Sequence, residues 1–134
     1  MEIINWIQIG LGVTFIYLII QSFGPVKNLT HLTEADFNEK MKKTKNVTLI
    51  DVRNPYEYSA DHIKGAINLP LSKIKRNKVE IPTDKDIILY CQTGIRSKQA
   101  AKVLRRRHKD MPIAHLKGGL FSLKTPPTPK KKHT

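Results

Sequence analysis

The first long pattern in the chain is an uncharged, mostly apolar run over residues 3–26, bounded by Glu2 and Lys27. As a helix, its 24 residues would extend about 36 Å, which exceeds the roughly 30 Å hydrocarbon core of a bilayer. The alternatives are a buried core helix and a cleaved signal peptide. A signal peptide needs a basic start and a small-x-small cleavage site, but no Lys or Arg precedes this run and Gln21-Ser22-Phe23-Gly24 fits such a site poorly. The pattern therefore predicts an uncleaved transmembrane helix.

The flanks of this run predict its orientation. Lys27 follows it at once, and Lys40, Lys42, Lys43 and Lys45 lie within about 20 residues. Because basic residues accumulate on the cytoplasmic side of a membrane helix, we expect the N-terminus outside and the rest of the chain in the cytoplasm. The sequence thus predicts a single-pass protein of the cell membrane.

After the run, short β-branched apolar segments alternate with amphipathic ones. We expect strands at residues 47–52, 66–69, 86–90 and 113–116. We expect helical segments to begin at Thr33 and at Asn54-Pro55, and a longer helix to span Ser97 to about His108. Such alternation favours an α/β domain with a parallel sheet flanked by helices. The predicted organisation is an anchor (1–28), this domain (29–123) and a tail (124–134) whose prolines and lysines favour disorder.

Composition adds constraints on partners. The chain has 134 residues with a net charge of +13, 40% hydrophobic and 26% charged, which is globular and excludes collagen-like or wholly disordered chains. Basic runs occur at residues 73–78, 105–109 and 130–132, but no aromatic residue interleaves with them, so a nucleic-acid partner is not expected. They fit contact with an anionic cytoplasmic leaflet or a solvated basic face, and the sequence leaves both open.

Cys91 is the chain's single cysteine, which excludes an internal disulfide framework and a Cys-rich zinc site. It ends a buried-type strand and is followed by a short loop with Gly94, Arg96 and the helix that begins near Ser97. Loop N–H groups, the positive end of that helix and the Arg96 charge would all favour the thiolate over the thiol. The alternative is an inert core cysteine. The surrounding pattern favours a reactive one.

Four motifs together resemble the rhodanese (sulfurtransferase) family. Cys91-Gln92-Thr93-Gly94-Ile95-Arg96-Ser97 is similar to that family's active-site loop. The stretch from Asp51-Val52-Arg53 to Glu57-Tyr58, the segment from His62 to Pro70 and the closing Leu116-Lys117-Gly118-Gly119 resemble its other motifs, in the family's order. With the apolar leader, the chain looks like small bacterial membrane-anchored rhodaneses of one domain.

The resemblance implies a sulfurtransferase in which Cys91 takes a sulfane sulfur as a persulfide, with no cofactor or metal. The donor would be thiosulfate or a persulfide, and the acceptor a thiol or cyanide. The backbone of Gln92, Thr93, Gly94, Ile95, Arg96 and Ser97 would cradle the sulfur, and Arg96 would help to hold an anionic donor. Related phosphatases and arsenate reductases carry five residues between Cys and Arg, whereas four lie between Cys91 and Arg96 here, which disfavours that activity. The alternative function is a catalytically weak module that docks a partner at the membrane.

The remaining polar candidates favour structural roles. Asp51 and Arg53 lie at a strand end, where we expect a salt bridge that orients loops. His62 and His115 are predicted to be hydrogen-bonded structural histidines, and His31 a surface one. No general base is assigned, because a pre-formed thiolate needs none.

Overall fold

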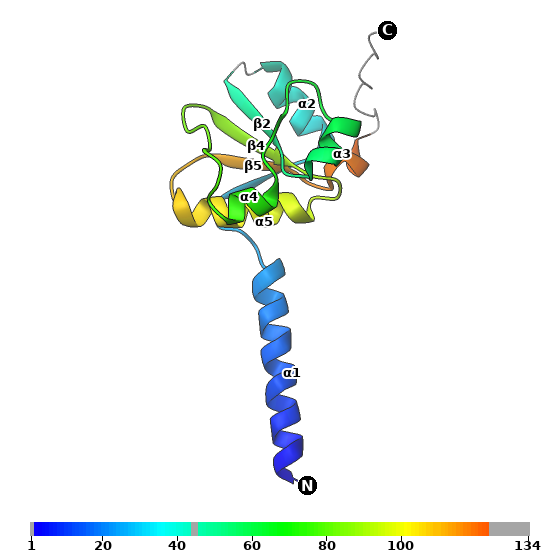
Figure 1. Cartoon of the computed structure of the whole chain (residues 1–134), viewed down its shortest axis with the longest axis vertical. Helices are drawn as coiled ribbons and strands as arrows, with labels where there is room; N and C mark the ends of the chain where they lie inside the picture. Colours follow the sequence, from blue (N-terminus) through cyan, green and yellow to red (C-terminus); the bar gives the residue numbers. More distant parts are fainter. Residues whose placement is uncertain (1, 44–45, 124–134) are drawn as a thin grey trace.

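A computed structural model of the chain describes residues 2–43 and 46–123, and its first element is the expected long helix, α1 (Glu2–Phe23). Residues 2–22 of this helix have a mean hydropathy of 2.0, and their most apolar stretch is entirely unburied. Figure 1 shows α1 extending away from the rest of the described chain. By length and composition α1 suits a membrane span or a signal sequence. The basic tail predicted at residues 124–134 lies outside the described residues.

The other described elements form a five-stranded sheet in the order β1-β5-β4-β2-β3, in which every pairing is parallel. The strands are β1 (Leu29–Leu32), β2 (Val47–Asp51), β3 (Ile67–Asn68), β4 (Asp86–Tyr90) and β5 (Ile113–Leu116). The three predicted central strands are therefore confirmed, with β2 one residue shorter than expected. Because the sheet is parallel, the carboxyl ends of β4, β2 and β5 meet at one edge, where ligand sites of open α/β sheets lie.

Helices cover both faces of the sheet, which confirms the predicted α/β architecture (Figure 1). On one face, α4 (Leu71–Lys75) and α5 (Ile95–Arg107) pack Ile74, Ala100, Ala101 and Leu104 against the sheet. On the other face lie α2 (Glu34–Lys43), α3 (Pro55–Ala60) and the 3₁₀ turn η1 (Gly119–Ser122). Alternate residues of β4 point to opposite faces, so Ile87 and Leu89 join the α5 side, and Ile88 and Tyr90 the α2 side.

Besides the shorter β2, the strand predicted at residues 66–69 is reduced to β3 (Ile67–Asn68), two elements were not predicted, and one helix begins earlier than predicted. Strand β1 was not expected, because only Leu32 of its four residues is buried at this edge of the sheet. Helix α4 was not expected because it has only five residues, directly after Pro70. Helix α5 begins at Ile95, two residues before the predicted start at Ser97, because Gly94 is its N-cap residue. The earlier start of α5 brings its N-terminus closer to Cys91.

Candidate active site

Cys91 lies at the carboxyl end of β4 and is completely buried. It continues the alternation of Ile87 and Leu89 and so faces the apolar cluster beneath α5. The chain then forms a short loop and enters α5, and we call residues 91–97 the Cys91 loop. Strand β4 therefore positions the sulfur at the carboxyl end of the sheet, as the sequence predicted.

The Cys91 loop directs backbone N–H groups at the sulfur. The N–H of Gly94 donates to Cys91 Sγ at 3.0 Å and that of Ser97 at 3.4 Å. Gly94 can turn its N–H inward because it adopts a left-handed conformation with φ +96°, which disfavours residues with a side chain. The N-terminus of the 13-residue α5 also lies beside the sulfur. Both features place positive partial charge where a thiolate or a persulfide anion would be.

Gly118 and Gly119, which follow β5, allow the next turn of the chain to pack closely against the Cys91 loop and support it. A Cβ on Gly119 would lie 2.5 Å from the Cys91 carbonyl oxygen and 2.5 Å from the Gln92 carbonyl. No side chain fits in that space, and the close approach lets the N–H groups of η1 reach the loop. Leu120 N donates to Cys91 O at 3.0 Å, and Phe121 N donates to Gln92 O at 3.1 Å. The closing Gly-Gly of the sequence is thus a support for the Cys91 loop.

A buried ion pair between Asp51 and Arg53 supports the Cys91 loop at Gln92. Arg53 donates from Nε to both carboxylate oxygens of Asp51 at 3.0 Å and from Nη2 to Oδ2 at 2.7 Å. Its Nη1 reaches Gln92 Oε1 at 3.2 Å. Asp51 is fully buried and Arg53 nearly so. The predicted salt bridge between Asp51 and Arg53 is confirmed, and through Gln92 it connects β2 to the Cys91 loop.

Arg96 already has an anionic partner within the protein. Its Nη1 and Nη2 donate to the two carboxylate oxygens of Glu57 at 2.7 and 3.0 Å, a two-pronged pair between α5 and α3. The hydrogen bond from Arg96 lowers the pKa of Glu57 to about 2, and the same contact raises the pKa of Arg96. Glu57 is therefore ionised at neutral pH and offsets the Arg96 charge. An anionic donor that binds Arg96 must compete with this carboxylate.

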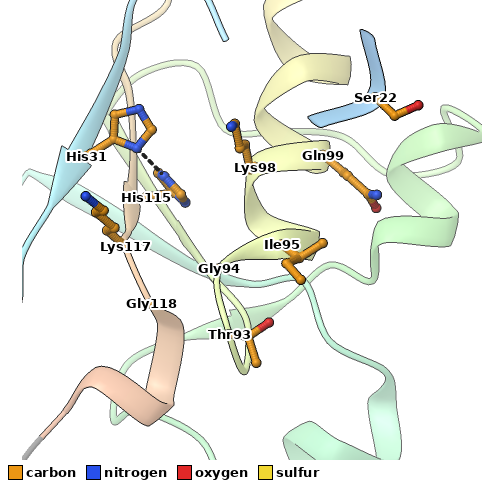
Figure 2. A pocket seen from close by; sticks show the side chains of 10 residues that line it. All are labelled: Ser22, His31, Thr93, Gly94, Ile95, Lys98, Gln99, His115, Lys117 and Gly118. Atoms are coloured by element: carbon orange, nitrogen blue, oxygen red, sulfur yellow. Dashed lines mark hydrogen bonds between the residues drawn. The ribbon is translucent and has the colours of Figure 1, made fainter. Parts of the chain in front are cut away.

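The remaining loop residues line two cavities. Thr93, Gly94 and Ile95 line one of about 410 Å³ that also receives His31 and His115 (Figure 2). Gln92 lines another of about 520 Å³, with Arg53 and Glu57 on its wall. Cys91 itself is completely buried and is not among the residues that line either cavity.

Sequence reasoning missed the connection of two histidines to this site. His115 is buried in β5, and its Nδ1 lies 2.9 Å from Ser97 Oγ, while its Nε2 lies 2.7 Å from Nδ1 of the exposed His31. The available signal was a polar residue within the otherwise apolar segment of residues 113–116. His62 has the structural role that was predicted, since its Nδ1 lies 2.7 Å from Tyr58 O and its ring stacks on Tyr58.

Comparisons with known proteins identify the family of this chain. The family model of the rhodanese-like domain matches residues 33–125. An uncharacterized protein of Bacillus subtilis, YqhL, is 43% identical over 116 residues, covering 86% of this chain and 89% of that protein. A protein of Allochromatium vinosum named sulfurtransferase is 30% identical over 94 residues, covering 70% and 87%.

A solved structure shares the fold. The rhodanese-related protein from Thermoplasma volcanium superposes with a TM-score of 0.60 at 29% identity, covering 69% of this chain and 88% of that one. The relative named sulfurtransferase, together with the family match, supports sulfur transfer in general for this chain. Because the family model matches residues 33–125, well over half of the chain, the chain belongs to the rhodanese-like proteins.

Proposed function

We propose that this protein is a sulfurtransferase in which Cys91 carries the transferred sulfur as a persulfide. The observation that carries the proposal is the position of Cys91 Sγ, which accepts hydrogen bonds from the N–H groups of Gly94 and Ser97 at the start of α5. An environment that stabilises negative charge on one sulfur also suits the terminal sulfur of a persulfide anion. The alternative, an inert core cysteine, gives no reason for these inward N–H groups.

The proposed reaction consists of two displacements at sulfur. The Cys91 thiolate attacks the sulfane sulfur of the donor, a new S–S bond forms, and the donor's own bond to that sulfur breaks. The departing group keeps the electron pair and leaves as sulfite from thiosulfate or as a thiolate from a persulfide. An acceptor thiolate or cyanide then attacks the outer sulfur, and Cys91 leaves as the thiolate. The cycle needs no external oxidant or reductant.

The residues of the Cys91 loop have different roles in this proposal. The backbone from Gln92 to Ser97 surrounds the sulfur, Gln92 is fixed by Arg53, and Thr93 and Ile95 form the wall of the adjoining cavity. Because Glu57 accepts hydrogen bonds from both Nη1 and Nη2 of Arg96, we propose that a persulfide donor is preferred to the doubly charged thiosulfate. Arg96 then serves mainly to join α5 to α3 beside the loop.

Intact-mass spectrometry of the full-length protein tests the persulfide directly. Incubation with thiosulfate or a small organic persulfide should add the mass of one sulfur atom, and reduction should remove it. Cys91→Ser should show no such adduct and no transfer to cyanide. A Cys91→Ser protein that transfers sulfur at the wild-type rate would refute the proposal.

The second candidate function is docking of a partner, with the thiol incidental. Alkylation separates the two, because an ordinary thiol with a pKa of about 8.5 is almost fully protonated at about pH 6. We expect iodoacetamide to modify Cys91 readily at that pH. Slow modification, similar to that of a free cysteine peptide, would favour the docking function.

We further propose that residues 1–28 anchor residues 29–123 to the cytoplasmic face of the cell membrane. Support comes from the apolar α1 and from the basic residues of α5, a helix that lies next to the C-terminal end of α1 (Figure 1). Arg105 donates from Nε to the Lys27 carbonyl at 3.0 Å and from Nη2 to that of Asn28 at 2.8 Å, and Lys102 bonds to the Gln21 carbonyl. Protease added to intact cells should spare the domain, and digestion of the domain would refute this orientation.

A further inference from the structure

A continuous line of hydrogen-bonding side chains leads from the buried sulfur to the surface. Cys91 Sγ lies 3.7 Å from Ser97 Oγ, and Ser97 Oγ lies 2.9 Å from His115 Nδ1. His115 Nε2 in turn lies 2.7 Å from His31 Nδ1, the contact drawn as a dashed line in Figure 2. The first three residues are buried, whereas His31 is exposed. These hydrogen-bonding side chains therefore connect the solvent-inaccessible sulfur of Cys91 with the solvent-exposed His31.

The fold sets the two histidines side by side. His31 and His115 are register partners in the parallel pairing of β1 with β5, so their side chains leave the sheet on the same face. Their rings meet edge to face with centroids 4.8 Å apart. Each ring nitrogen of the buried His115 thereby has a partner, as a buried polar side chain requires.

His115 has the protonation state that a proton carrier needs. Burial lowers its pKa to about 4, and the nearby positive groups, His31 on β1, Lys98 on α5 and Lys117 after β5, act in the same direction. At neutral pH the ring is uncharged, so one nitrogen donates and the other accepts. Such a ring can accept a proton at one nitrogen and release another from the opposite one.

We propose that Ser97, His115 and His31 form a relay that carries the Cys91 proton to solvent when the thiol becomes a thiolate, a role that rests on the sulfur-transfer function proposed above. The S–H bond breaks and its electron pair stays on sulfur. The proton passes to Ser97 Oγ as Ser97 gives its own proton to His115 Nδ1. His115 gives its Nε2 proton to His31 Nδ1, and His31 loses its outer Nε2 proton to water. No group changes oxidation state.

The same heavy-atom positions serve the chain before and after this transfer. Afterwards, the Ser97 hydroxyl points at the thiolate and accepts a hydrogen bond from His115 Nδ1, so the relay also stabilises the charged sulfur. Ser97 Oγ also lies 3.0 Å from the Gly94 carbonyl, which is a second acceptor for its hydroxyl hydrogen.

The exit of the relay opens into the cavity of about 410 Å³ beside the loop. His31, Lys98 and Lys117 line this cavity with His115 (Figure 2). Water or a small buffer molecule in the cavity would complete the path.

Fast trapping of the thiolate in the full-length protein tests the relay without any sulfur transfer. Below the pH at which Cys91 loses its proton, and at high concentrations of an aromatic disulfide reagent, trapping outruns reprotonation, so the rate of Cys91 modification reaches a plateau set by proton departure. We expect His31→Ala to lower this plateau about tenfold or more, within reach of the roughly 10²–10⁴-fold effects of positioned acids and bases. Added imidazole should restore the plateau of the variant and leave the wild type unchanged.

Two comparisons make the result decisive. Thr30→Ala changes the neighbouring exposed residue of β1, whose register partner is Ala114, and should behave as wild type. His115→Gln, checked for folding by circular dichroism, should lower the plateau as His31→Ala does. A His31→Ala plateau equal to that of the wild type, or one that imidazole does not raise, would overturn the relay. Failure of the persulfide assay alone would refute the sulfur-transfer function and leave this trapping result standing.

Discussion

Replacing Gly119 with alanine should release the Cys91 loop from the turn that follows β5. The new Cβ would lie 2.5 Å from Cys91 O and from the Gln92 carbonyl, far inside the distance that backbone atoms tolerate. Because those neighbours are backbone, the turn itself must move. That movement removes the hydrogen bonds from Leu120 N to Cys91 O and from Phe121 N to Gln92 O. The substitution thus acts on stability and on the site together.

The expected loss of unfolding free energy follows from these contacts. The two hydrogen bonds contribute about 1 kcal/mol each. The left-handed conformation of Gly119, at φ +62°, costs a residue with a side chain about 1–2 kcal/mol. We therefore expect Gly119→Ala to lose about 3–4 kcal/mol in urea unfolding, and sulfur transfer to fall with it.

Gly65 provides the matched control. It also has a positive φ, of +87°, but a Cβ there would have nothing within 4 Å. Gly65→Ala should therefore lose only the conformational part, about 1–2 kcal/mol, and keep its sulfur transfer. Equal losses of stability in the two variants would refute the role assigned to the close approach of Gly119.

Three further predictions concern the ion pairs around the loop. Glu57→Gln removes the carboxylate that competes with an anionic donor for Arg96. The KM for thiosulfate in steady-state kinetics should therefore fall about fivefold, which corresponds to about 1 kcal/mol for a partly exposed pair. An unchanged KM would show that the donor does not bind Arg96. The pKa of Glu57 is lowered to about 2, chiefly by the hydrogen bond from Arg96, from an ordinary value of 4.5. The pair therefore contributes its full stability above about pH 4.5 and loses it as the pH falls toward 2, so urea unfolding of wild type and Glu57→Gln should differ at neutral pH, by no more than about 1 kcal/mol, and converge in acid. Finally, Arg53→Met leaves the fully buried Asp51 without its cationic partner and should lower the free energy of unfolding in urea by about 3–5 kcal/mol. Arg96→Met removes a pair whose side chains are 32% and 22% exposed and should lower it by about 1 kcal/mol or less. Similar losses in the two variants would contradict the difference in burial between the two ion pairs.

The sequence predicted those parts of the fold that have a strong local pattern. Strands β2, β4 and β5 are short apolar runs buried on both faces, and α5 has a clear apolar side, so each was found close to its observed bounds. Strand β1 escaped because an edge strand with one buried residue has no such pattern. Helix α1 was predicted from the length of its uncharged, mostly apolar run and not from an apolar side.

The candidate site was predictable only in its local part. Cys91, Gly94 and Ser97 lie within one loop, so their spacing already indicated the cradle that the N–H groups form. The contacts of that loop with the rest of the chain were not predictable, because they join distant residues. Glu57 reaches Arg96 across 39 positions, and His31 reaches His115 across 84. These contacts depend on the strand order of the sheet, and no local pattern encodes it.

The central claim, that Cys91 carries and delivers sulfur, is tested most directly by a single turnover. The full-length protein is loaded with sulfur from a persulfide donor, freed of excess donor and mixed with cyanide. The proposed function predicts one thiocyanate formed for each Cys91 persulfide, with the protein returning to its original mass. Loaded protein that keeps its added sulfur, or thiocyanate formed equally well by Cys91→Ser treated in the same way, would contradict it.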